Sequence, residues 1–261
     1  MPFTIATWNI NSVRLRAGLV ARLLAEEAPD ILCLQEIKTP IDKFPGDFAA
    51  LGYTHMVARG QKGYNGVAIL SRLPISDAGA MDPAGLNHAR HVAARLDGGV
   101  TIHNVYVPAG GDIPDRAENV KFGQKLDFLT DLRDWGRAAR PERSILVGDL
   151  NIAPRADDVW NHKALLKIVS HTPIEVEHLA DAAEAGGWVD VTRADIPAGP
   201  LFSWWSYRSP DWDAADKGRR LDHIWATRDI AGAGHSSRIL RAARGWDQPS
   251  DHAPVFATFD L

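Results

Sequence analysis

Apolar residues along the chain follow two patterns. One predicts β-strands and the other predicts helices, and the two kinds of element are interspersed along the sequence. Short apolar runs bounded by turn residues predict strands. We expect these at 3–10, 30–36, 52–59, 66–72, 143–152, 220–227, 236–242 and 254–261, with a hairpin over 91–108. Apolar residues three and four positions apart predict helices over 12–28 and 114–136, and the less regular stretch 153–187 predicts short helices and loops. Because strands and helices mix from end to end, we expect one α/β domain over residues 1–261.

Composition and charge narrow the class of protein. The 261 residues are 45% hydrophobic and 24% charged, which is typical of a soluble globular protein. No apolar run approaches the roughly 20 residues that span a bilayer, and the N-terminus resembles no signal peptide. Cys33 stands alone, so it can form no internal disulfide, and we expect a cytoplasmic protein. The net charge of −4 argues against nucleic-acid binding by bulk charge but allows a local basic face.

Polar side chains follow several of the expected strands at the point where each strand ends. Any one of them is typical of an ordinary turn. Together, they would be costly to remove from water without partners. A hard cation and a phosphate would supply those partners. The residues concerned are Asn9, Asn11, Gln35, Glu36, Tyr106, Asp149, Asn151, Asp222, His223, Asp251 and His252.

These residue types favour hydrolysis by water over covalent catalysis. Glu36 is a suitable ligand for Mg²⁺, which prefers oxygen donors. The chain has no zinc-ligand spacing, no GxxxxGK[ST] phosphate loop and no GxSxG serine motif. An attacking water needs a base, a metal that takes up developing charge, and donors for the phosphate oxygens.

Eight segments, in their order along the chain, resemble the exonuclease III family of AP endonucleases within the endonuclease/exonuclease/phosphatase superfamily. "QE", "GDLN" and "SDH" belong to the whole superfamily, whereas "NINSVRLR" and "FSWWSYR" are particular to the exonuclease III branch. The segments are WNINSVRLR (8–16), DILCLQEIK (30–38), YNGVAILSR (64–72), NVYVPAGG (104–111), VGDLNIAP (147–154), FSWWSYR (202–208), RLDHIWAT (220–227) and SDHAPV (250–255).

The resemblance implies a fold and a reaction. The fold would be a four-layer α/β sandwich, in which two mixed β-sheets pack face to face with helices outside. The reaction would be Mg²⁺- or Mn²⁺-dependent hydrolysis of duplex DNA, 5′ to abasic sites and at 3′ ends. The enzyme would act at the nucleoid, and for its oligomeric state, which the sequence does not fix, our default expectation is a monomer.

The same resemblance assigns roles to residues of this chain. The metal would be held by Glu36, with Asn9 and Asp251 near it. His252, oriented by Asp222, would contact the scissile phosphate. Asp149 would either deprotonate the water or orient it, and Tyr106 and Asn151 would hold the phosphate. The expected DNA-binding residues are Arg14, Arg16, Lys62, Asn65, Lys121, Lys125, Trp204, Arg208, Arg219, Arg220 and Leu221.

The chain departs from the family pattern at two positions. Many relatives carry Asn or Gln after "YVP", where this chain has Ala109, so one phosphate contact is either absent or supplied otherwise, for example by the backbone of Gly110 and Gly111. Arg219 stands where some relatives place an apolar residue in the abasic pocket.

Two alternative functions stay open at this point. One is a phosphodiesterase of the same superfamily with another substrate, such as a general DNase or a lipid or inositol phosphate hydrolase. The other is a catalytically inactive DNA-binding module, which the presence of the whole set of polar residues disfavours.

Overall fold

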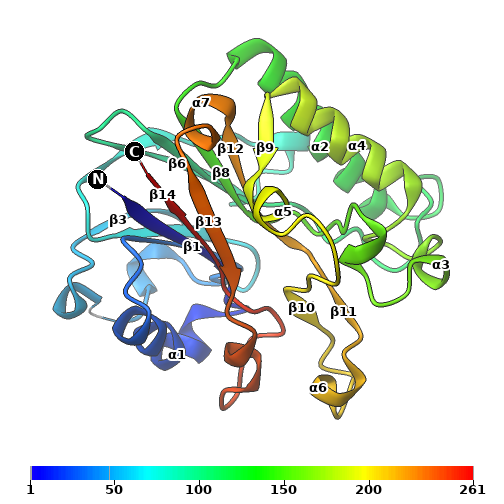
Figure 1. Ribbon diagram of the computed structural model, residues 1–261, viewed down its shortest axis with the longest axis horizontal. Coiled ribbons are helices and arrows are strands. Elements are labelled where there is room, and N and C mark those ends of the chain that lie inside the picture. The colour runs from blue at the N-terminus through cyan, green and yellow to red at the C-terminus, as the bar shows by residue number, and fades with distance from the viewer. Residues whose placement is uncertain (1, 47, 261) are drawn as a thin grey trace.

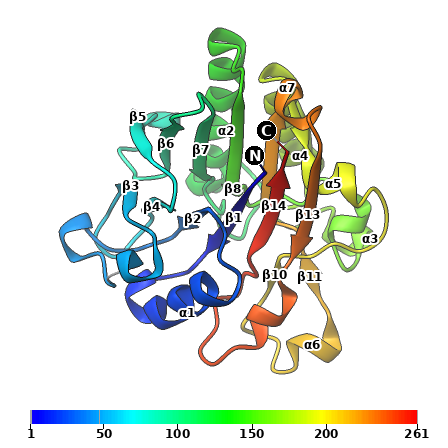
Figure 2. The same ribbon diagram turned by 60° about the vertical axis from the view of Figure 1, so that its left-hand side comes forward.

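Two β-sheets form the centre of the molecule in the computed structural model, which describes residues 2–46 and 48–260 (Figures 1 and 2). The first sheet contains β1 (Phe3–Asn9), β2 (Ile31–Gln35), β3 (His55–Arg59), β4 (Val67–Ser71), β13 (His235–Ile239) and β14 (Val255–Phe259). The second contains β5 (Ile75–Gly79), β6 (His91–Leu96), β7 (Thr101–Tyr106), β8 (Ser144–Asp149), β9 (Trp188–Asp190) and β12 (Asp222–Thr227). A separate ribbon joins β10 (Trp204–Trp205) to β11 (Gly218–Arg219).

The helices lie outside the sheets. They are α1 (Val13–Glu26), α2 (Val120–Ala139), α3 (His162–Leu165), α4 (Pro173–Ala185), α5 (Val191–Asp195), α6 (Trp212–Ala215) and α7 (Arg228–Ala231), with short 3₁₀ helices in some loops. In Figure 2, α1 lies against the first sheet while α2 and α4 lie on the side of the second. Among the described residues, no helix is both long enough and apolar enough to cross a membrane.

Both sheets are mixed. The strand orders are β13-β14-β1-β2-β4-β3 and β5-β6-β7-β8-β12-β9. Within them β1 pairs with β2 and β7 pairs with β8 in parallel, while the remaining pairs are antiparallel. This arrangement confirms the four-layer sandwich expected from the resemblance.

Successive residues of the central strands point to different layers of the core. Ile5 and Ile145 lie in the core between the sheets, whereas their neighbours Ala6 and Leu146 pack under the helices on the two outer faces. A strand covered on both faces needs apolar residues at every position, which explains the unbroken apolar runs in the sequence. Cys33 is buried between the sheets, as expected of a core residue.

Most predicted strands and the first helix are confirmed, but several elements differ from expectation. The helix predicted over 114–136 is α2, Val120–Ala139; it begins later because the side chain of Asn119 caps it by accepting a hydrogen bond from the Lys121 amide. The stretch 153–187 contains the 13-residue helix α4, which begins with a capping box between Thr172 and Glu175. Strands β5 and β9 were not predicted; both lie at edges of the second sheet.

Candidate active site

The polar residues expected to form a site lie together because the strands that carry them end in the same region. Asp149, the last residue of β8, is the register partner of Asp222 on β12 and of Tyr106 on β7. The two sheets meet through Asn9, whose side-chain amide donates to both Glu36 and Asp149 at 2.9 Å. The site therefore joins the first sheet to the second.

The backbone takes unusual conformations at this junction. Gly148 has φ 142°, and a Cβ atom there would lie 1.9 Å from the carbonyl oxygen of Val105, so the position immediately before Asp149 accepts no side chain. Glu36 (φ 49°) and Asn151 (φ 55°) are in the left-handed region, which costs about 1–3 kcal/mol per residue and is typical of functional sites. These turns direct side chains from the strand ends into one space.

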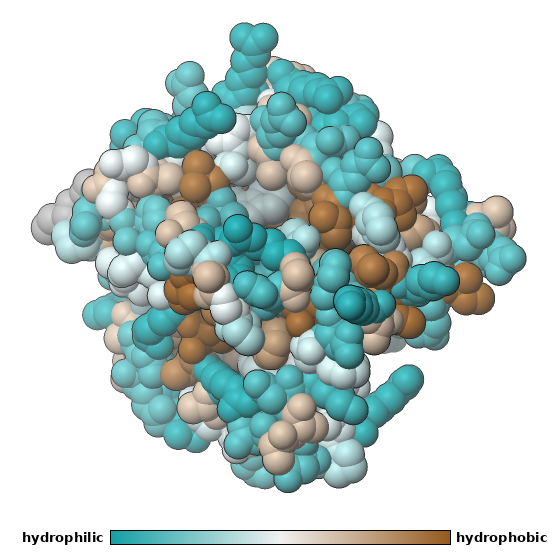
Figure 3. Space-filling view, turned by 45° about the vertical axis from the view of Figure 1, so that its right-hand side comes forward, coloured by the Kyte–Doolittle hydropathy of each residue, from teal (hydrophilic) through white to brown (hydrophobic). Residues whose placement is uncertain are grey.

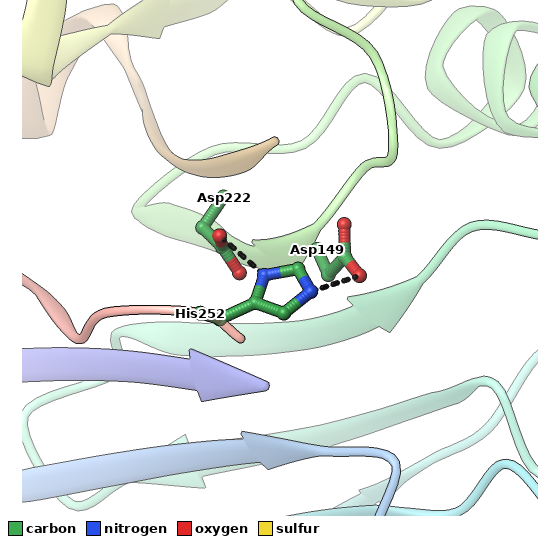
Figure 4. A group of neighbouring side chains, drawn as sticks. All are labelled: Asp149, Asp222 and His252. Carbon is green, nitrogen blue, oxygen red and sulfur yellow. Dashed lines mark hydrogen bonds and ion pairs between the residues drawn. The ribbon is translucent and has the colours of Figure 1, made fainter. Parts of the chain in front are cut away.

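His252 lies between two carboxylates (Figure 4). Its Nδ1 is 2.8 Å from Oδ2 of Asp222, and its Nε2 is 3.7 Å from Oδ2 of Asp149. The same Asp222 oxygen accepts a hydrogen bond from the hydroxyl of Ser203 at 2.6 Å. Burial alone would lower the pKa of His252, but the charges of Asp222 and Asp149 outweigh it and raise the pKa to about 10. His252 is therefore an imidazolium at neutral pH, which suits contact with an anion.

Asp149 is buried and accepts hydrogen bonds from three donors. These are the Asn9 amide, the backbone N–H of Asn151 at 2.9 Å and the Asn151 side-chain amide at 3.1 Å. Burial raises the pKa of Asp149 to about 7, although the positive charge of His252 acts in the opposite direction. A carboxylate with a pKa near the working pH is well matched to exchange a proton with water.

Glu36 is held as a carboxylate at the side of the site formed by the first sheet. Its Oε2 lies 2.8 Å from the ammonium of Lys38, and its other partners are Asn9 and the hydroxyl of Tyr106. Burial would raise the pKa of Glu36, but Lys38 and these hydrogen bonds outweigh it and lower the pKa below its usual value. The ammonium of Lys38 also donates to Asn11, so this corner of the site stabilises a cation.

The donors around Glu36 fit a hard divalent cation. Asn9, Glu36 and Asp251 offer amide and carboxylate oxygens, the ligands that Mg²⁺ prefers. Asp149, Asp222 and His252 also bring ligand atoms within 4.8 Å of one another, but His252 already fills the space between the two carboxylates. The oxygen-rich corner at Glu36 is therefore the better candidate for the metal.

Asp251 reaches the site although it is adjacent to His252 in the chain. Its two carboxylate oxygens accept hydrogen bonds from the Asn11 side chain at 3.2 Å and from the indole of Trp204 at 2.9 Å. An isolated β-bridge between Trp204 and His252 holds this part of the chain against the β10–β11 ribbon.

These residues open onto a cleft of about 890 Å³. Glu36, Asp149, Asn151, Asp251 and His252 line one part of it, and Trp204, Arg219 and Leu221 line another part. On the side of the molecule that carries α3, β10 and β11, Figure 3 shows hydrophobic residues in small groups among hydrophilic ones. The cleft can thus receive a ligand that has both anionic and apolar parts.

The expected DNA-binding residues divide into exposed and buried ones. Arg14, Lys62, Lys121 and Arg208 are exposed, and Trp204 and Arg219 are half-buried in the cleft wall. Leu221 is 5% exposed yet still lines the cleft. Asn65 is buried, and its amide donates to Gln61.

Three of the expected DNA-binding cations require correction. Lys125 and Arg220 are fully buried, where they pair with Glu175 and Asp158, respectively. Arg16 is 8% exposed and donates to backbone carbonyls and to the hydroxyl of Tyr207. Their charges are used inside the protein, so they contribute no contact to an outer basic face.

Ser203 was missed as a functional candidate, and Asn11 was named among the polar residues at strand ends but given no role. Ser203 donates to Asp222 and thereby fixes the carboxylate that orients His252. Asn11 connects Lys38 with Asp251. The signal for Asn11 was its place two residues after Asn9, whereas Ser203 had only its place within "FSWWSYR".

Comparison with known sequences places this architecture in a family. A model of the endonuclease/exonuclease/phosphatase family matches residues 6–252. The exodeoxyribonuclease III of Haemophilus influenzae is 31% identical over 267 residues, covering 97% of this chain and 98% of the relative. The exodeoxyribonuclease of Bacillus subtilis is 27% identical over 260 residues, covering 96% and 97%.

Solved structures show the same likeness. An AP endonuclease from Archaeoglobus fulgidus superposes with a TM-score of 0.92 at 33% identity, covering 99% of this chain and 100% of the other. A 3′ phosphatase, NExo, from Neisseria bound to a product DNA hairpin gives a TM-score of 0.91 at 33% identity, with the same coverage.

Proposed function

This chain belongs to the endonuclease/exonuclease/phosphatase family, within its exonuclease III branch, and on that premise we propose that it is a metal-dependent DNA repair nuclease. It hydrolyses the phosphodiester 5′ to abasic sites in duplex DNA and removes nucleotides or blocking groups from 3′ ends. The observation that carries this proposal is the line Asp222–His252–Asp149 beside the Glu36 carboxylate in one cleft. Within this cleft, the imidazolium of His252 supplies a positive charge for the phosphate, and the carboxylate of Asp149 supplies a base for the attacking water.

Each side chain of the site has a separate role in hydrolysis. Asp149, with a pKa near 7, receives a proton from the attacking water. The imidazolium of His252 donates to a phosphate oxygen, and Asp222 fixes the orientation of the ring. Because the side-chain amide of Asn151 already donates to Val107 and Asp149, we assign Asn151 to orienting Asp149. The hydroxyl of Tyr106 holds Glu36 in position.

The metal of this proposal is Mg²⁺, for which Mn²⁺ substitutes. Glu36 would hold it, with Asn9 and Asp251 beside it. A bound divalent ion would neutralise charge that develops on the phosphate oxygens.

Exposed cations in and around the cleft support a DNA partner. Exposed cations at Arg14, Lys62, Lys121 and Arg208 would neutralise backbone phosphates, which makes binding weaken as salt increases. We propose that a monomer acts in the cytoplasm at the nucleoid.

The test uses an end-labelled duplex that carries one abasic analogue. We expect cleavage immediately 5′ to the analogue with Mg²⁺, complete loss of cleavage in EDTA, and recovery when Mg²⁺ or Mn²⁺ is restored. Cleavage that persists in the chelator would exclude the metal. A protein that binds the duplex without cutting would be an inactive binding module, and one that cuts at random would be a general DNase.

A further inference from the structure

Arg219 is a half-buried cation in the cleft wall whose hydrogen-bond partners in the protein are uncharged. Its Nη1 donates to the carbonyl of Val169 at 2.9 Å and to the hydroxyl of Ser170 at 2.6 Å. Of the guanidinium nitrogens in residues 2–46 and 48–260, only Nε of Arg219 is buried without a hydrogen-bond partner. The carboxylate of Glu175 attracts Arg219, but it already pairs with the buried ammonium of Lys125. The two cations therefore share one carboxylate, and an anionic ligand would neutralise the remaining positive charge.

The position of Arg219 connects it to the catalytic groups. Its guanidinium carbon lies 5.4 Å from the ring centroid of Trp204, and the indole N–H of Trp204 donates to Asp251. Trp204 also pairs by a β-bridge with His252. Arg219 is thus one side chain away from the residues that face the scissile phosphate, and it lines the same cleft.

A loop with available donors lies next to Arg219. Among the described residues, none accepts a hydrogen bond from the peptide N–H groups of Ala109, Gly110 or Gly111. Val169 links this loop to Arg219, because a Cβ atom at Gly110 would lie 3.1 Å from Cγ1 of Val169, whose carbonyl Arg219 binds. Ala109 and Gly111 line the same cleft as Arg219, and because Ala109 supplies no side-chain donor, the loop can donate to a ligand only through peptide N–H groups.

These donors fit a terminal phosphate better than an abasic sugar. A 3′-terminal phosphate monoester has one more free anionic oxygen than an internal diester, in which that oxygen carries the next sugar. The extra oxygen can accept charge-assisted hydrogen bonds from Arg219. An uncharged deoxyribose would instead lie against a cation that it cannot neutralise.

Resting on the proposed function, we propose that Arg219 is a specificity-determining residue that favours 3′-terminal phosphate monoesters over abasic sites. In the favoured reaction, water adds to phosphorus and the bond between phosphorus and the 3′ oxygen breaks. The 3′ oxygen takes up a proton, so the products are a 3′ hydroxyl and inorganic phosphate. The neighbouring loop at Ala109–Gly111 assists by donating from its backbone.

The test compares two substrates with Mg²⁺ present, a duplex with a recessed 3′-phosphate and a matched duplex with an internal abasic analogue. Arg219→Gln should lower kcat/KM for phosphate release by about 10- to 100-fold, the effect of losing one or two charge-assisted hydrogen bonds. Cleavage at the abasic analogue should stay the same or rise. Arg219→Lys should restore part of the phosphate release, because it keeps the charge but not the planar fork.

Lys217→Gln is the matched control, since this exposed lysine also lines the cleft. It should change both substrates by the same factor, as a general loss of attraction to DNA does. Inorganic phosphate gives a second measurement, because its inhibition constant should rise in both Arg219 variants and not in Lys217→Gln. Thermal unfolding of each variant verifies that it is folded.

The outcomes separate this inference from the proposed function. A wild-type protein that acts on neither duplex would overturn the proposed function. A wild-type protein that acts on DNA, combined with an Arg219→Gln variant whose two activities fall by the same factor, would overturn the role of Arg219 alone. Unchanged inhibition by phosphate in Arg219→Lys would also overturn it.

Discussion

A buried histidine pair in the second sheet should make the protein less stable in mild acid. The amide of Met81 donates to Nδ1 of His91, so Nε2 of His91 carries the proton and donates to Nδ1 of His103 at 3.2 Å. His103 also packs against Trp135 and Trp188. Burial lowers the pKa of His103 to about 4, and the pKa of His91 falls well below its usual value. The fold therefore requires both rings to be neutral.

The size of the effect follows from the pKa of His103. The unfolded chain takes up a proton near pH 6.5, whereas the folded protein takes it up only near pH 4. The contribution of neutral His103 is therefore complete above pH 6.5 and is lost as the pH falls from 6.5 to 4. Between pH 7.5 and 5.0 this linkage removes about 2 kcal/mol of the free energy of unfolding.

Urea unfolding followed by tryptophan fluorescence measures this loss. We compare wild type with His103→Gln, in which the side-chain oxygen can still accept from His91. The stability difference between them should shrink by about 2 kcal/mol from pH 7.5 to 5.0. His178→Gln, on α4 and outside the pair, should keep the wild-type dependence. A constant difference between wild type and His103→Gln would refute the reasoning.

The other predictions concern the site itself. His252→Asn should lower single-turnover cleavage by about 10²- to 10⁴-fold while duplex affinity survives; near wild-type turnover would remove the imidazolium from the mechanism. Glu36→Gln should raise the Mg²⁺ concentration for half-maximal rate by about tenfold or more, and an unchanged metal requirement would place the ion elsewhere. Gly148→Ala should destabilise the fold by about 3 kcal/mol in urea, because its Cβ would collide with the carbonyl of Val105; wild-type stability would mean that the backbone relaxes there.

The meeting of the polar residues in one place could be predicted because each stands next to an apolar run. Asp149 follows Ile145–Val147, and Glu36 follows a strand with both faces buried, so the end of the strand was visible in the sequence. The position of a residue at a strand end was enough to predict that it lies at the site, because a polar group there is at the rim of the core. The same reasoning failed for β5, which lies at a sheet edge and is largely exposed.

The buried cations could not be predicted because their partners are distant in the chain. Lys125 pairs with Glu175, 50 residues away, and Arg220 pairs with Asp158, 62 residues away. A sequence pattern marks a lysine or arginine as charged, and the usual expectation is an exposed side chain. Only the fold reveals that Lys125 donates to the carbonyl of Asn151 and thus supports the loop behind the catalytic carboxylate.

The central claim is that side chains from separate segments act as one unit on one phosphate. The most direct test is the single-turnover cleavage rate of the Asp149→Asn/His252→Asn double variant, compared with the two single variants on the abasic duplex. If both groups serve one chemical step, the double variant should be no slower than the slower single variant by more than a small factor. Rate losses that multiply in the double variant would contradict the account.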